Sequence, residues 1–140
     1  TSIMSLYLLD TDTCSYIMKR SHPILLSKIQ AIPLAHQAIS IITLSELLYG
    51  VKLSSKPKQS REALDAFVLH LAVLDWSGEA AEHYADIRAD LRKRGQPIGS
   101  NDLLIAAHAR SLKATLVTNN VREFAKVKGL KVENWTGRSG

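Results

Sequence analysis

Short apolar runs alternate with amphipathic segments along this chain of 140 residues, and that alternation constrains the fold more than any other feature. The first run, residues 6–10, reads LYLLD and ends at an acid, which is the pattern of a buried strand. The same reasoning predicts strands over residues 6–10, 37–42, 72–75, 115–118 and 131–135, and helices over 13–19, 24–31, 43–53, 59–70, 78–94 and 101–112, with a helical turn at 120–125. This order predicts an α/β fold in which helices cover both faces of a mostly parallel sheet of about five strands.

The composition is that of one globular domain, with 46% hydrophobic and 22% charged residues. We expect a single domain over residues 4–136, with residues 1–3 and 137–140 as flexible or vector-derived ends. No apolar run reaches the roughly 18 residues that a membrane helix requires, so no membrane association is expected. The single cysteine, Cys14, excludes an internal disulfide, and together with the lack of a signal peptide it predicts a cytoplasmic protein.

Three acids stand at the ends of predicted elements. Asp10 ends the first strand, Glu46 is expected in the first turn of the helix after the second strand, and Asp102 in the first turn of the helix over 101–112. The carboxyl ends of parallel strands form one rim of a sheet, where ligands bind. A polar run at residues 118–120 leaves the fourth strand at the same rim. We therefore expect these acids to converge.

Such a cluster carries a strong electrostatic cost. Two carboxylates ~5 Å apart repel by roughly 3 kcal/mol at an effective dielectric near 20. Three of them must raise their pKa values, recruit cations or bind a metal ion. The five histidines show no zinc-ligand spacing. Hard oxygen ligands without paired His or Cys suit Mg²⁺ or Mn²⁺, which activate water for hydrolysis.

Each acid also has a purely structural interpretation. Thr43 and Glu46 have the spacing of a capping box, Asp102 would favour the positive end of its helix, and Asp12 could cap the first helix. However, Asp10, Glu46 and Asp102 all lie in apolar surroundings, where an acid without a partner is costly. A shared metal ion explains all three at once.

The chain is basic, with a net charge of +5 and a pI near 9.5, which permits binding to a polyanion without establishing it. Two basic clusters stand out, one around Lys52 and Lys56 and the other over residues 92–94. They fit either solvated helix ends or contacts to a phosphate backbone, and a position beside a site would favour the second interpretation.

Four segments carry a resemblance to a known family. LLDTDTCSYIMK, ITLSELLYGV, RGQPIGSNDLLIAAHA and LVTNNVREF, in this order and spacing, resemble the PIN-domain ribonucleases, and more narrowly the VapC-type toxins of bacterial toxin–antitoxin pairs. The resemblance extends from Leu6 to Trp135. It implies a PIN-like α/β/α sandwich, a Mg²⁺ or Mn²⁺ cofactor held by Asp10, Glu46 and Asp102, a homodimer, and neutralisation by a VapB-like antitoxin.

The family's fourth acidic position falls at Asn120, where many PIN domains have Asp, and Glu123 lies one turn further on as a substitute ligand. This departure leaves open whether one metal ion binds or two. Asp12 stands where close relatives often have Asn, and it would either bind metal through water or cap the helix. Thr11 and Thr118 are expected to orient carboxylates or water.

The reaction that the resemblance implies is hydrolysis of RNA phosphodiester bonds, with a structured RNA such as a tRNA as the favoured substrate class. Basic side chains are expected to follow the RNA backbone, namely Lys52, Lys56, Arg92, Lys93 and Arg94. Two alternatives remain open. One is an RNA-binding module that has lost catalysis, which Asn120 favours, and the other is a DNase or general phosphodiesterase that uses the same metal site.

Overall fold

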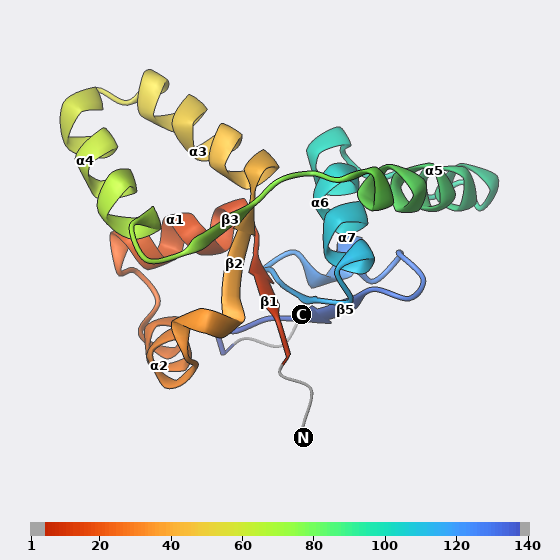
Figure 1. Ribbon diagram of the computed structural model, residues 1–140, viewed down its shortest axis with the longest axis horizontal. Helices are drawn as coiled ribbons and strands as arrows, with labels where there is room; N and C mark the ends of the chain where they lie inside the picture. Colours follow the sequence, from red (N-terminus) through yellow and green to blue (C-terminus); the bar gives the residue numbers. More distant parts are fainter. Residues whose placement is uncertain (1–4, 138–140) are drawn as a thin grey trace.

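The computed structural model describes residues 5–137, which form a central sheet of five strands flanked by seven α-helices and one short 3-10 turn (Figure 1). The strands are β1 (Tyr7–Leu9), β2 (Gln37–Ser40), β3 (Ala72–Leu74), β4 (Thr115–Val117) and β5 (Lys131–Glu133). The helices are α1 (Thr11–Lys19), α2 (Pro23–Ala31), α3 (Ile41–Leu53), α4 (Pro57–Val68), α5 (Gly78–Lys93), α6 (Ser100–Ser111) and α7 (Val121–Phe124), and the 3-10 turn η1 is Leu34–His36. Residues 1–3 and 138–140, expected as ends, and residue 4, the expected start of the domain, lie outside the described residues.

The strand order is β3-β2-β1-β4-β5, and every pair of neighbours is parallel. From β1 the chain adds β2 and β3 on one side of the sheet and then returns to add β4 and β5 on the other. The sheet therefore has a switch point between β1 and β4, and the crevice outside the carboxyl ends of strands at such a point is where ligands bind in open α/β sheets. The predicted α/β fold with a parallel sheet of about five strands is confirmed.

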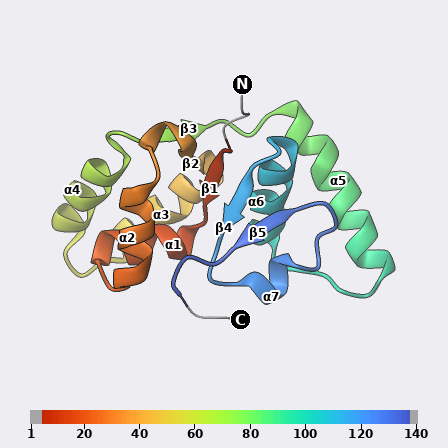
Figure 2. The ribbon, with the colours of Figure 1, turned by 90° about the horizontal axis from the view of Figure 1, so that it is seen from below.

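The core has two halves, one on each face of the sheet. Successive residues of a strand point to opposite faces, so Leu8 belongs to the half beneath α5, α6 and α7, whereas Leu9 belongs to the half beneath α1 to α4. Figure 2 shows these two groups of helices on either side of the strands. The pairs Ala38/Ile39 and Leu116/Val117 alternate in the same way. Burial on both faces explains why the strands are continuous apolar runs.

Five helices begin one or two residues earlier than expected, namely α1, α2, α3, α4 and α6. The second strand ends at Ser40 rather than at residue 42, and α3 begins at once because the Ser40 hydroxyl accepts a hydrogen bond from the Ile42 N–H at 3.0 Å. The fourth helix was expected to begin at residue 59, but α4 begins at Pro57. Proline is suited to a first helical position because its missing N–H would have no partner there.

The helix expected over residues 101–112 begins at Ser100; Gly99 occupies the capping position of α6 and makes no side-chain capping bond. None of the helices within residues 5–137 is both long and apolar enough to span a membrane.

A buried hydrogen bond joins α6 to the residue that caps α3. His108 of α6 is only 1% exposed, and its Nδ1 lies 2.7 Å from the Ser40 hydroxyl. Burial lowers the pKa of His108, which keeps the imidazole neutral at neutral pH. Ser40 therefore has two roles, since it caps α3 and fixes the position of α3 against α6.

We expect Ser40→Ala to lower the free energy of unfolding by about 2–4 kcal/mol, because it removes the cap of α3 and leaves a buried imidazole nitrogen without its partner. Urea denaturation measures this change. Ser45→Ala is the matched control on the same helix, because the Ser45 hydroxyl is exposed and bonds only the Ile41 carbonyl. It should cost no more than about 0.5 kcal/mol. Equal losses in the two variants would contradict the dual role of Ser40.

Candidate active site

Asp10 is the most deeply placed acid at the carboxyl rim. It follows β1 directly, is 6% exposed and caps α1, because its Oδ1 accepts a hydrogen bond from the Thr13 N–H at 2.9 Å. Of the two roles left open for Asp12, capping of this helix is wrong, since Asp12 lies inside the first turn with an exposed side chain. Burial raises the pKa of Asp10, although hydrogen bonds from Thr118 and Thr13 oppose that rise.

Glu46 faces neighbouring elements rather than its own helix end. Its Oε1 accepts a hydrogen bond from the Thr11 hydroxyl at 2.8 Å, and its Oε2 accepts one from the Asn101 amide at 3.1 Å. The capping-box interpretation is therefore wrong: Ser40 caps α3, and Thr43 lies inside the helix. Because α3 begins at Ile41, Glu46 stands in the second turn rather than the first.

Asn101 was not anticipated from the sequence. The available signal was its place beside Asp102 at the start of a helix that was expected to reach the rim. Its contact with Glu46 spans 55 positions and joins α6 to α3. Thr11, which was expected to orient a carboxylate, makes the matching contact from α1.

Asp102 has a strongly raised pKa. It lies half-buried in the first turn of α6, and its pKa is raised to about 7. Burial is the largest cause, followed by a hydrogen bond with Glu123 and by the negative charges of Glu123, Asp10 and Glu46. Carboxyl groups from four separate segments therefore share one rim, as three of them were expected to do.

Glu123 supplies the fourth carboxyl group, and Asn120 holds it in place. The Asn120 side-chain amide donates to Glu123 Oε2 at 3.0 Å, while its backbone N–H donates to the Thr118 hydroxyl at 2.9 Å. Thr118 is buried and also hydrogen bonds Asp10. Asn120 thus contributes hydrogen-bond donors to the rim, and Glu123, one turn further along the chain, supplies the negative charge.

The donor set matches a divalent cation in its chemistry. Within residues 5–137 no three His, Cys, Asp or Glu side chains are placed to hold a metal ion together, and both oxygens of Glu46 accept hydrogen bonds. However, hard oxygen donors dominate the rim, and their negative charges add to the effect of burial in raising the pKa of Asp102. The Thr43 hydroxyl, one turn before Glu46 on α3, is buried without a hydrogen-bond partner among the described residues. These groups fit a hard cation such as Mg²⁺ or Mn²⁺.

Two cavities flank the acids. One of about 440 Å³ lies among α1, α3 and α4 and includes Thr11 and Glu46 in its lining. The other, of about 330 Å³, lies between α5 and α6 and includes Arg92 and Ser100.

The predicted basic residues differ in their surroundings. Lys52, Lys56, Arg92 and Lys93 are exposed. Arg94 is held in place by an ion pair with Asp90 at 2.7 Å and by a hydrogen bond to the Lys126 carbonyl, so it braces the end of α5. Of the cluster at residues 92–94, Arg92 lines the cavity between α5 and α6.

An all-parallel sheet with carboxyl groups from four segments at its switch point defines an α/β protein whose site suits a hard cation. The PIN domain family model matches residues 7–130, and the chain belongs to the PIN-domain family.

Curated relatives and solved structures agree with this assignment. The chain is 42% identical to the ribonuclease VapC2 of Rickettsia felis, over 93% of this chain and 98% of the relative. It is 37% identical to the tRNA(fMet)-specific endonuclease VapC of Salmonella typhimurium, over 92% of this chain and 97% of the relative. The crystal structure of VapBC2 from Rickettsia felis bound to a DNA fragment from their promoter matches with a TM-score of 0.87 and 39% identity, over 93% of this chain and 98% of that chain. The resemblance to PIN domains of the VapC type is confirmed.

The raised pKa of Asp102 predicts how stability depends on pH in the absence of divalent cations. Between the ordinary carboxyl pKa of 3.8 and the folded-state pKa of about 7, the folded protein binds more protons than the unfolded chain. The stability contributed by that proton is therefore lost as the pH rises through this window. In EDTA, Asp102→Asn should raise Tm relative to the parent protein at about pH 8, and the difference should shrink towards about pH 5. Scanning calorimetry at both pH values measures it, and a difference independent of pH would contradict the assignment.

Proposed function

We propose that this chain is a metal-dependent endoribonuclease that hydrolyses RNA phosphodiester bonds and serves as the toxin of a toxin–antitoxin pair. The observation that carries the proposal is the convergence of four carboxyl groups at the switch point of a PIN fold, namely those of Asp10, Glu46, Asp102 and Glu123. Relatives that share 37–42% of their residues with it are named as ribonucleases or endonucleases.

Asp10, Glu46 and Asp102 would hold Mg²⁺ or Mn²⁺, with Glu123 as the fourth carboxylate. When bound, such an ion supplies Lewis acidity that stabilises charge on a reacting phosphate. The chain's own residues orient the acids: Thr11 and Asn101 fix Glu46, while Thr118 and the Thr13 N–H fix Asp10.

In the hydrolysis, the oxygen of water bonds to phosphorus as the bond from phosphorus to the leaving ribose oxygen breaks. Asp10 and Asp102 are the carboxylates that we assign to orient this water and to receive its proton. The leaving oxygen takes a proton from solvent.

The substrate class that we propose is a structured RNA with an exposed single-stranded loop, such as a tRNA. Sequence-specific recognition of RNA uses unstacked bases in loops. The relative from Salmonella typhimurium is named as specific for tRNA(fMet). Exposed cations on either side of the acids, Lys52 and Lys56 on one side and Arg92 and Lys93 on the other, would contact the backbone and make the affinity depend on salt.

The partner that we propose is a VapB-like antitoxin, on the strength of the similarity to the VapBC2 structure. A homodimer and a cytoplasmic location complete the proposal. The homodimer rests on the family resemblance alone, and the location on the single free cysteine, whose thiol is buried.

The test is cleavage of total RNA by the purified protein with Mg²⁺, with EDTA, and with Asp10→Asn. We expect EDTA to abolish cleavage and the variant to lose more than about 100-fold in rate, beyond the effect typical of residues outside the metal's direct ligands. Asparagine caps helices about as well as aspartate, so this variant removes the charge while preserving the start of α1.

The other outcomes separate the alternatives. Equal nicking by the parent protein and the variant would point to a contaminating nuclease and refute the assignment. Binding of RNA without cleavage would favour the inactive module. Equal cleavage of DNA would indicate a general phosphodiesterase, and mapping the ends of cleaved RNA identifies the substrate.

A further inference from the structure

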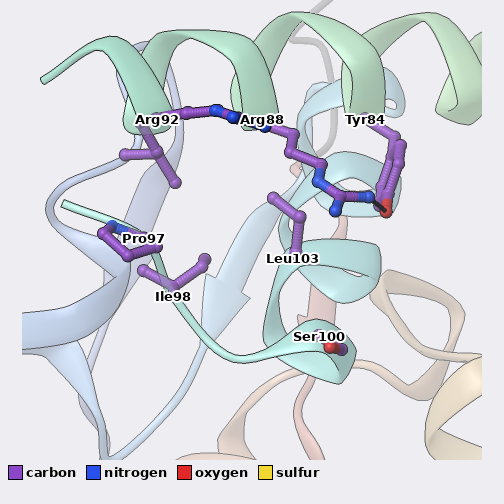
Figure 3. Close-up of a pocket in the computed structure, with 8 residues that line it drawn as sticks. Tyr84, Arg88, Arg92, Pro97, Ile98, Ser100 and Leu103 are labelled. Carbon is purple, nitrogen blue, oxygen red and sulfur yellow. Dashed lines mark hydrogen bonds between the residues drawn. The ribbon is translucent and has the colours of Figure 1, made fainter. Parts of the chain in front are cut away.

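The cavity of about 330 Å³ between α5 and α6 is lined by both apolar and cationic side chains. It lies where the segment after α5 turns back beneath that helix and enters α6 (Figure 3). Tyr84, Arg88 and Arg92 reach into it from α5, Ile98 lies in the connecting segment, and Ser100 and Leu103 come from the first turn of α6. Its volume falls at the lower end of the range for small-molecule sites.

One wall is apolar, aromatic and firmly held. Leu103 is 6% exposed and belongs to the core, and Ile98 packs against the same core. The Tyr84 ring meets the edge of Trp76 at 6.0 Å between centroids and 78° between planes. The Trp76 N–H in turn donates to the Leu104 carbonyl at 3.0 Å, which anchors this aromatic pair to α6.

The same helix that carries Tyr84, α5, also brings positive charge to the cavity, and no ion pair with an acid neutralises it within residues 5–137. Arg88 donates to the Tyr84 hydroxyl at 2.8 Å, and its guanidinium carbon lies 5.8 Å from the centre of that ring. The Arg92 guanidinium makes no hydrogen bond or ion pair within residues 5–137. By contrast, Arg94 at the end of the same helix pairs with Asp90. Two guanidinium groups on α5 therefore remain available to an anion.

The cavity adjoins the acidic rim. Ser100, in its lining, is two residues before Asp102, and Asn101 between them hydrogen bonds Glu46. The first turn of α6 thus presents residues to the acids and to the cavity at once. A strand whose phosphate lies at the acids reaches the cavity by passing over this turn.

We propose that this cavity is a subsite for one nucleotide of the RNA strand, next to the phosphate that is cleaved; this inference rests on the proposed function. The base packs against the wall formed by Tyr84, Ile98 and Leu103, and Arg88 and Arg92 hold the adjoining phosphate. Single-stranded bases bind on aromatic side chains and guanidinium planes, and the planar fork of arginine matches a phosphate with two parallel hydrogen bonds. A volume of about 330 Å³ admits one unstacked nucleotide.

The test measures binding separately from cleavage. In an Asp10→Asn background, fluorescence anisotropy follows the binding of labelled single-stranded RNA oligonucleotides of random sequence. Arg88→Lys and Arg92→Lys keep the charge but lose the forked geometry, and each should weaken binding about 10-fold. Arg61→Lys is the matched control, because that exposed guanidinium already pairs with Asp65 on α4, and it should leave the affinity unchanged.

A further variant tests the apolar wall. Tyr84→Leu keeps a large apolar side chain without the ring, and it should reduce the difference in affinity among oligo(A), oligo(C), oligo(G) and oligo(U). Arg88→Lys or Arg92→Lys should instead lower the affinity for all four oligonucleotides.

Three results would overturn the subsite. Unchanged affinity in both lysine variants, with binding by the parent intact, would refute it and leave the proposed function standing. A shift of either variant to a smaller species in size-exclusion chromatography would make the cavity a contact between subunits. Absence of RNA binding by the Asp10→Asn parent would remove the subsite together with the proposed RNA substrate.

Discussion

Repulsion between like charges at the carboxyl rim is the constraint on which the rest of the structure depends. Carboxyl groups from four segments share this rim, and a pair ~5 Å apart repels by roughly 3 kcal/mol at an effective dielectric near 20. The raised pKa of Asp102, caused first by burial and then by a hydrogen bond with Glu123 and by the neighbouring negative charges, shows that ionising this group is unfavourable in the protein alone. The energy that stabilises the charged rim must come from a cation or a proton bound there, and from packing that keeps the four segments together.

That packing begins directly beneath the acids. β1 and β4 are buried on both faces, so Asp10 and Thr118 leave the sheet from neighbouring, fixed positions. The bond between Ser40 and His108 ties the start of α3 to α6, which places Glu46 opposite Asn101. Hydroxyl and amide donors then hold individual carboxylates without adding charge. The geometry of the site therefore depends on core contacts several residues away from it.

The sequence was sufficient for the sheet and for the convergence of the acids, because hydrophobic periodicity repeats over many residues and parallel strands share one rim. The sequence did not predict where several helices begin, because a single hydrogen bond to a side chain decides the first residue of a helix. Asp10 and Asp12, or Ser40 and Thr43, are locally equivalent caps, and only tertiary contacts select between them. Asn101 and Arg88 were missed for a related reason. Asn101 hydrogen bonds Glu46, which lies 55 positions away in the sequence. Arg88 lines a cavity that forms only when the chain turns back on itself.

The role of the Asn120 amide depends on its hydrogen bond to Glu123. Taken alone, Asn120 in place of an acid favours an inactive site. In the fold, however, its amide donates to Glu123, and Glu123 in turn contacts Asp102. An aspartate at position 120 would place a fifth carboxylate against Glu123 and increase the repulsion that already raises the pKa of Asp102. The pair of Asn120 and Glu123 therefore keeps four carboxyl groups at the rim and adds a donor that steadies the fourth. Asparagine at this position is thus compatible with a charged, metal-binding site, and it does not by itself argue for loss of catalysis.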